Sequence, residues 1–187
     1  RQRWTAEPTG EIGADMYNPP AFAVTDAERA RELVRTYNFA LVTAVLDGNI
    51  HFAYAATFVV ERGEQNCIQF HLARPNPVAS VVDGAPLKLS FLGPHEYVSP
   101  NWYAQPNQVP TWNYIAAEAS GSVRRLNEME LVTHLRTLAD QEERRILHQP
   151  PWTPDAVEPG RMSGLLNAIS GFEVALNSLE GKLKLSQ

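Results

Sequence analysis

The alternation of apolar and polar residues predicts a chain built mainly of β-strands. Residues 39–45 and 50–60 are rich in Val, Phe, Ala and Thr, and Asp47-Gly48 between them is typical of a tight hairpin turn. Further strands are expected at 67–72, 86–92, 115–123 and 171–179. Six strands with helices at the ends and in one insertion predict an α+β protein, mainly β, with a small closed or split barrel.

Helical spacing marks two short segments outside these strands. Thr25 and Asp26 are N-cap candidates for a first helix, in which apolar residues recur every three or four positions until about Tyr37. Residues 162–169 are expected to form another short helix before the last strand.

The longest helix is expected to begin at Asn127. It has an apolar stripe on one face and charged residues on the other, as is typical of a helix packed on a core. The stripe consists of Met129, Leu131, Val132, Leu135, Leu138 and Ala139. His134 is predicted to face solvent with the charged residues, and His148 is also expected on the surface.

Composition limits the possible classes of protein. The 187 residues fit an extended arm (residues 1–15) and a single domain (residues 16–187). No apolar run has membrane-spanning length and the first residues lack the apolar core of a signal peptide, so a cytoplasmic protein is expected. With a net charge of −5 and no Lys/Arg block, DNA binding is not expected. The single cysteine, Cys67, excludes an internal disulfide and a multi-cysteine metal site.

Residues 93–114 are unusually rich in aromatic residues and proline. Four prolines fix φ and remove backbone donors, so a shaped loop is expected here instead of a helix or a central strand. Flat rings with a few polar groups are typical of a pocket for a planar ligand, although such rings can also cover the end of a core. The rings are His95, Tyr97, Trp102, Tyr103, Trp112 and Tyr114, interleaved with Ser99, Asn101, Thr111 and Asn113.

Four sequence motifs occur along the chain in an order shared with a known family. They are Met16-Tyr17…Pro20…Phe22, then His71-x-Ala-Arg-x-Asn-Pro77, then Gly93-Pro-His-x-Tyr-x-Ser-Pro-x-Trp-Tyr103 with Pro110-Thr-Trp-Asn-Tyr114, and finally Leu179-Glu-Gly-Lys-x-Lys-Leu-Ser-Gln187. Together they resemble the PaiB-type family, whose members are named FMN-binding negative transcriptional regulators. The resemblance implies a homodimeric FMN-binding split β-barrel with its cofactor in a cleft between the subunits.

The resemblance also implies contacts to an acidic group of the cofactor. Arg74 and Asn76 match a basic motif that holds the cofactor phosphate in split-barrel flavoproteins. A guanidinium and an amide in a tight turn are suitable donors to a phosphate or a propionate. Lys182 and Lys184 alternate onto one face of the last segment and would serve the same acidic group.

Departures from the family pattern point to one of its branches. Tyr54 and Ala56 stand where the family has histidine and proline, Glu118 stands where it has histidine, and the tryptophan expected after Asn-Pro is missing at Val78-Ala79. The chain therefore also resembles the heme-dependent piperazate synthases, which close N5-hydroxy-L-ornithine into L-piperazic acid by forming an N–N bond. The alternatives are an FMN-binding regulator or flavoprotein, and a cofactor-free dimeric binding module.

A heme b site requires an axial ligand and aromatic walls. His71 or His95 would supply the ligand, with His71 placed first, and Trp102 and Trp112 would supply the walls. The other cofactor contacts expected in the aromatic segment are Ser99, Asn113 and Tyr114.

Two residues are candidates for the chemistry on an amino-acid substrate. Glu118 would hold the α-amine or take its proton, and Tyr54 would assist loss of the hydroxyl group as water. The simpler alternatives are that Glu118 pairs with Arg124 or Lys88 on a barrel face, that Tyr54 lies in the core, and that His71 only packs on its strand.

Overall fold

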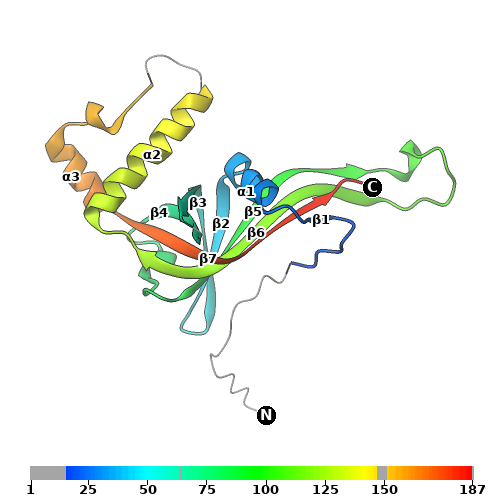
Figure 1. Cartoon of the computed structure of the whole chain (residues 1–187), viewed down its shortest axis with the longest axis horizontal. Coiled ribbons are helices and arrows are strands. Elements are labelled where there is room, and N and C mark those ends of the chain that lie inside the picture. The colour runs from blue at the N-terminus through cyan, green and yellow to red at the C-terminus, as the bar shows by residue number, and fades with distance from the viewer. Residues whose placement is uncertain (1–15, 64, 147–150, 187) are drawn as a thin grey trace, which may run out of the picture.

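The computed structural model describes residues 16–63, 65–146 and 151–186. The expected arm at residues 1–15 and the expected surface position of His148 lie outside these ranges. The described chain forms a mainly antiparallel β-barrel with three α-helices (Figure 1). None of the described helices is long and apolar enough to cross a membrane.

Six long strands close into a ring. The strand order is β1-β7-β4-β3-β2-β5-β6, and an additional β7–β6 ladder closes the barrel. The strands are β1 Ala23–Val24, β2 Phe39–Leu46, β3 Asn49–Arg62, β4 Gln65–Ala73, β5 Pro86–Val98, β6 Thr111–Arg125 and β7 Ile169–Lys184. Every ladder is antiparallel, and the six predicted strands and the barrel are confirmed.

The helices lie around this ring. α1 (Ala27–Thr36) is capped by Asp26, which accepts a hydrogen bond from the Arg29 backbone, and packs against β7. α2 (Glu128–Ile146) and α3 (Pro159–Asn167) stand together at one end of the molecule (Figure 1). Short 3₁₀ turns are η1 (Pro77–Ser80), η2 (Pro100–Trp102) and η3 (Pro154–Ala156).

Alternate residues of each strand fill the barrel interior. The largest fully buried side chains there include Phe70 and Phe172, whose rings stack with centroids 5.3 Å apart, and Phe91. Residues between these positions point outward, so each strand has one apolar inner face and one outer face that is available for function.

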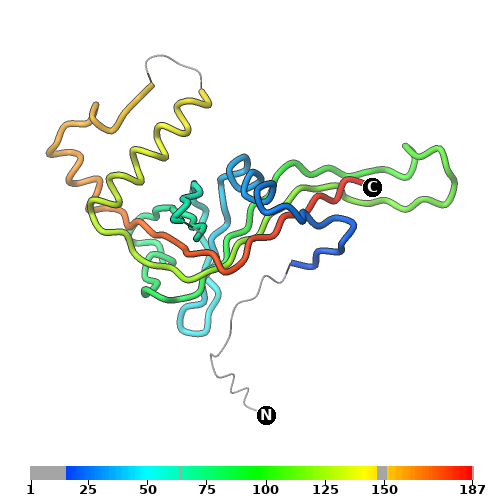
Figure 2. Tube along the Cα trace, in the orientation of Figure 1, coloured from blue at the N-terminus to red at the C-terminus, as the bar shows by residue number. Residues whose placement is uncertain are grey.

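The prediction of a loop over residues 93–114 is wrong in its extent, because the irregular segment is shorter. β5 continues to Val98 and β6 begins at Thr111, so only the tip is irregular. Residues 93–114 form a hairpin that extends beyond the barrel (Figure 2), and this hairpin is called the arm below. The prolines did not prevent this because the β2–β5 ladder ends at Phe91, which leaves one edge of β5 unpaired. Pro94 lies at a bulge between Leu92 and His95.

At Gly121 the backbone of β6 lies unusually close to the backbone of its neighbour β7. A Cβ at this position would overlap the carbonyl oxygen of Ala175 and lie 2.8 Å from its carbonyl carbon. The β6–β7 register shifts between Ser120 and Gly121, which marks a β-bulge.

We expect Gly121→Ala to lower the free energy of unfolding by about 3 kcal/mol or more, because the added methyl group must displace backbone. Urea unfolding would measure the change. Gly164→Ala in α3 is the control, because a Cβ there meets nothing within 4 Å, and it should be neutral or slightly stabilising. A loss below about 1 kcal/mol for Gly121→Ala would contradict the close approach.

Candidate functional site

The expected site residues fall into separate parts of one chain. Tyr54, His71, Arg74 and Asn76 lie on β3, β4 and the turn after β4. Those on the arm and the end of β7 are His95, Ser99, Trp102, Trp112, Asn113, Tyr114, Lys182 and Lys184. Glu118 lies on the barrel portion of β6. A single chain therefore does not bring all of them to one pocket.

His71 lies against a second histidine, His134, which was expected on the surface. His71 Nδ1 is 2.9 Å from His134 Nε2, and the two rings meet edge to face with centroids 5.1 Å apart. His134 also stacks on Phe58 at 5.1 Å and is 0% exposed. The predicted surface position of His134 is therefore wrong, because this face of α2 packs on the outside of β3 and β4.

Burial keeps both imidazoles neutral. It lowers the pKa of His71, and it lowers the pKa of His134 to about 3, with the neighbouring His71 adding to the effect. The pair shares one proton between His71 Nδ1 and His134 Nε2, and the outer nitrogen His134 Nδ1 is buried with no hydrogen-bond partner among the described residues. When His71 Nδ1 carries this proton, its Nε2 keeps a free lone pair.

We expect His134 to make stability depend on pH. The folded pKa of about 3 lies below the ordinary histidine value of 6.5, so between pH 6.5 and 3 only the unfolded chain takes up the proton. This contribution to stability is complete above pH 6.5 and is lost as the pH falls towards 3, with a slope of up to about 1.4 kcal/mol per pH unit.

Urea unfolding between pH 7.5 and 4.5 would test this expectation. The variant His134→Gln should lose that part of the slope, because glutamine does not titrate. The variant His51→Gln, which removes a histidine outside the pair, should keep it. Equal slopes for wild type and His134→Gln would show that the buried imidazole does not control the pH dependence.

The turn after β4 carries the expected acid-binding motif. Arg74 is exposed, and its backbone N–H bonds the carbonyl of Ala168 at 2.9 Å. The Asn76 side chain caps η1 by accepting the Val78 backbone N–H at 2.9 Å. Arg74 thus presents its guanidinium to solvent at the junction of α3 with β7, whereas the Asn76 carbonyl oxygen already has a structural role.

Tyr54 and Glu118 belong to one row across the outer surface of the barrel. Cross-strand pairing links Tyr54 to Leu41, Leu41 to Ser90, and Ser90 to Glu118. This separation is three strand spacings, roughly 14 Å along the sheet. In the six-stranded ring β3 lies opposite β6, so the outward side chains of Tyr54 and Glu118 in one chain point away from each other.

Glu118 is paired with a cation and stands beside a second carboxylate. Lys88 Nζ lies 3.0 Å from Glu118 Oε2. Glu180 is the cross-strand partner of Glu118, and its Oε2 is buried with no hydrogen-bond partner among the described residues. The Lys88 alternative for Glu118 is therefore confirmed. Arg124, the other expected partner, pairs instead with Glu130 and Glu173.

Two lysines and two tyrosine rings form a cluster where the arm meets β7. Lys182 is 5% exposed, and its Nζ lies 5.3 Å from the ring centroids of both Tyr17 and Tyr114. Lys184 Nζ donates to the Trp112 carbonyl oxygen at 2.6 Å and lies 6.0 Å from the Tyr114 centroid. Both lysines are on one face, as expected, but they are held by cation–π contacts and main-chain oxygens.

The arm holds its aromatic residues on an exposed surface. His95 and Trp112 lie 6.3 Å apart between ring centroids, and Trp102 at the tip is 69% exposed. Ser99 caps η2 through the Asn101 backbone N–H. The Asn113 side chain accepts from Ser186, so the expected polar groups serve the arm's own structure.

The outer face of β2, β3 and β5 has large apolar side chains that the described chain leaves uncovered. Tyr54 is 64% exposed and stacks on Phe39 with centroids 6.0 Å apart, so the alternative of a core tyrosine is wrong. The exposed apolar residues of this face are Phe39, Val45, Ile50, Phe52, Tyr54 and Leu92, which we call the β2–β3 patch. A patch of this kind marks an interaction surface.

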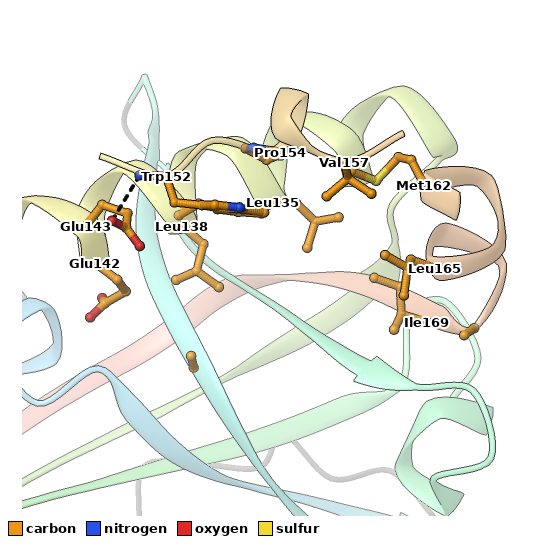
Figure 3. Close-up of a pocket in the computed structure, with 13 residues that line it drawn as sticks. Leu135, Leu138, Glu142, Glu143, Trp152, Pro154, Val157, Met162, Leu165 and Ile169 are labelled. Carbon is orange, nitrogen blue, oxygen red and sulfur yellow. Dashed lines mark hydrogen bonds between the residues drawn. The ribbon is translucent and has the colours of Figure 1, made fainter. Parts of the chain in front are cut away.

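A cavity of about 540 Å³ lies between α2, α3 and the barrel (Figure 3). Its walls are almost entirely apolar, and Ala56 on β3, two residues from Tyr54, forms part of them. The cavity is further lined by Leu135, Leu138, Trp152, Met162, Leu165 and Ile169, and Glu142 and Glu143 stand at one end.

Three features of these surfaces differ from or lie outside the sequence predictions: the buried position of His134, the pairing of Glu180 and the cavity. His134 follows Leu131 by three residues and precedes Leu138 by four, so its spacing already placed it on the buried side of α2. Glu180 is adjacent to the lysine motif but its pairing with Glu118 depends on the β6–β7 register. The cavity depends on how α3 returns to the barrel, which no local pattern indicates.

Comparison with protein families identifies one matching model. The model described as "Putative FMN-binding domain" matches residues 16–178. Among curated proteins, the chain is 29% identical over 173 residues to "Protease synthase and sporulation protein PAI 2" of Bacillus subtilis (strain 168), covering 92% of this chain and 82% of that protein.

Solved structures share the fold at low sequence identity. The FAD and heme binding protein from Mycobacterium smegmatis has a TM-score of 0.60 and 19% identity, over 87% of this chain and 73% of that one. The flavocytochrome Anf3 from Azotobacter vinelandii has a TM-score of 0.61 and 13% identity, over 88% of this chain and 70% of that one. These similarities confirm the split-barrel fold.

Proposed function

Since the chain belongs to the family described as a Putative FMN-binding domain, we propose that it is a heme-dependent member that cyclises N5-hydroxy-L-ornithine to L-piperazic acid with loss of water. The reaction is redox-neutral: the α-nitrogen forms a bond to N5 while the N5–O bond breaks. A heme bound through His71 would supply a Lewis-acidic iron for the hydroxylamine group.

The observation that carries this proposal is the His71–His134 pair. An axial imidazole must be neutral and must offer a lone pair, and burial lowers the pKa of both rings. His134 engages Nδ1 of His71, and no hydrogen bond to His71 Nε2 is found among the described residues. A histidine ligand is normally supported in this way, by a partner on its other nitrogen.

One cation that would suit a propionate lies close to His71 in the sequence. Arg74, three residues further along the chain, is an exposed guanidinium for a propionate. The FAD and heme binding protein of Mycobacterium smegmatis, which shares the fold, supports this choice of cofactor. The lysines Lys182 and Lys184 would support a second acidic group only if another chain brought them near.

Two side chains would perform the proton transfers. Glu118 would take a proton from the α-ammonium group so that its nitrogen can attack, and Tyr54 would donate one to the departing hydroxide, which leaves as water. Because these residues face opposite directions in one chain, the proposal requires Tyr54 of one chain and Glu118 of another at each site.

We further propose that the protein is a homodimer whose interface includes the β2–β3 patch and extends across β5 to Glu118 on β6, so that Tyr54 of one chain meets Glu118 of the other. The patch includes the exposed rings of Phe39, Phe52 and Tyr54, whose burial would contribute about 1.5–3 kcal/mol per side chain. A second copy would also cover the exposed aromatic arm. Stable interfaces characteristically bury such aromatic residues at their centre.

The second candidate function is that of an FMN-binding regulator or flavoprotein. It is favoured by the family description and by the exposed Arg74, which would equally suit a phosphate. Parallel titration of the purified protein with hemin and with FMN, followed by incubation with N5-hydroxy-L-ornithine and mass spectrometry, separates the candidates. A Soret band and a product 18 mass units lighter support the cyclase. Tight FMN binding without hemin binding would overturn it.

A further inference from the structure

The apolar side chains that line the cavity between α2 and α3 remain partly exposed to solvent. Trp152 and Leu165 are each 48% exposed although both line the hollow. Its volume of about 540 Å³ falls within the range of about 300–1,000 Å³ that is usual for small-molecule sites. Covering these side chains with an apolar ligand would remove hydrocarbon surface from water, which is favourable.

One end of the cavity has a negative charge. Glu142 is already engaged, since its Oε1 accepts from the Asn38 amide at 2.8 Å and its Oε2 lies 3.4 Å from Arg145. Glu143 Oε2 accepts the Trp152 backbone N–H at 3.0 Å, and its Oε1 has no hydrogen bond among the described residues. Figure 3 shows Glu143 beside Trp152 at the edge of the apolar walls.

Apolar walls with an acidic end select a ligand by both polarity and charge. A fatty acid would fit the walls but would place its carboxylate near Glu142 and Glu143, where like charges repel. A neutral alcohol would gain only the apolar contacts. An amine would gain these contacts and the attraction of a carboxylate that is half removed from water.

We propose that this cavity binds an amphiphilic amine, with its apolar chain between α2 and α3 and its ammonium group against Glu143. His71 does not line the cavity, and neither do Glu118, Lys182 or Lys184. The site is thus separate from the residues assigned to the cyclase reaction, and the proposal does not depend on heme.

Binding of decylamine, decanol and decanoate to the protein without added hemin or FMN tests this proposal. Titrations at pH 7 below the micellar concentration would be followed by calorimetry and by Trp152 fluorescence, with Trp152→Phe identifying the signal. We expect decylamine to bind about fivefold more tightly than decanol, and decanoate to bind more weakly than decanol. Shortening the amine by one methylene should weaken binding about fourfold.

Two matched variants assign the charge preference. Glu143→Gln should lower the affinity for decylamine to that for decanol and leave the affinity for decanol unchanged. Glu128→Gln removes the same charge from the first turn of α2, 15 residues or roughly 22 Å away, and should retain the preference. Equal binding of the three probes by wild type, or an unchanged preference in Glu143→Gln, would refute the ammonium site.

A third variant tests whether the apolar chain of the ligand lies in the cavity. Leu165→Trp would fill the cavity from α3 and should weaken all three probes at least tenfold, whereas Met129→Trp, at an exposed position on α2, should not. Undiminished binding by a folded Leu165→Trp protein would place the probes elsewhere. Because no step uses hemin, failure here and failure of the cyclase proposal are separate outcomes.

Discussion

Replacing His71 by alanine should abolish the Soret band of the hemin-reconstituted protein and lower the rate of piperazic acid formation at least about 100-fold. Among the described residues, His71 is the one imidazole of the β4 site that would face iron, since His134 is fully buried behind it. His134→Gln should retain hemin with a shifted Soret maximum, because the ligand remains but its hydrogen-bond partner changes.

His95→Ala is the matched control for this experiment. His95 lies on the arm beside Trp112 and is the other histidine predicted as a ligand. Its replacement should leave the Soret band intact. Added imidazole should restore the band in a folded His71→Ala protein by entering the space of the missing ring. Loss of the band in His95→Ala, with retention in His71→Ala, would move the ligand to the arm.

A mixed dimer of Tyr54→Phe and Glu118→Gln chains should have roughly half of wild-type activity, although each variant alone should be at least about 100-fold impaired. The reason is the position of β3 opposite β6 in the barrel. If each site takes Tyr54 from one chain and Glu118 from the other, the mixed dimer has one site with both residues intact and one site with neither.

Two different affinity tags and sequential purification would provide this mixed dimer. The control is a dimer that carries the two different tags but has Tyr54→Phe in both chains, and it should stay inactive. If the Tyr54→Phe/Glu118→Gln dimer is equally inactive, the two residues do not act together across a subunit interface. Light scattering on the same samples would test the homodimer itself.

Local patterns were sufficient for most of the barrel. The Asp47-Gly48 hairpin, the Asp26 cap of α1 and the alternation along β2 and β4 follow from short-range stereochemistry, and all are present. The extent of the arm differs from the prediction for a physical reason. Proline is incompatible with a central strand, but an edge without a hydrogen-bonding neighbour tolerates Pro94, and only the sheet order shows where such an edge begins.

The candidate site was harder to predict because it depends on distant pairings. The motif containing His71 was found from sequence, but its partner His134 is 63 residues away and was assigned to solvent. Glu118 and Tyr54 were placed in one site on chemical grounds alone. Their separation follows from the order in which β3, β2, β5 and β6 join, which one sequence without its fold does not specify.

The position of β7 has a consequence for how the protein is made. β7 supplies the ladders to both β4 and β6, and 43 residues that include α2 and α3 separate β6 from it. Until β7 has been synthesised, the growing chain has an open sheet with two unpaired edges. Such edges favour aggregation and non-local pairing slows folding, so recovery of native protein should depend on chaperones during translation.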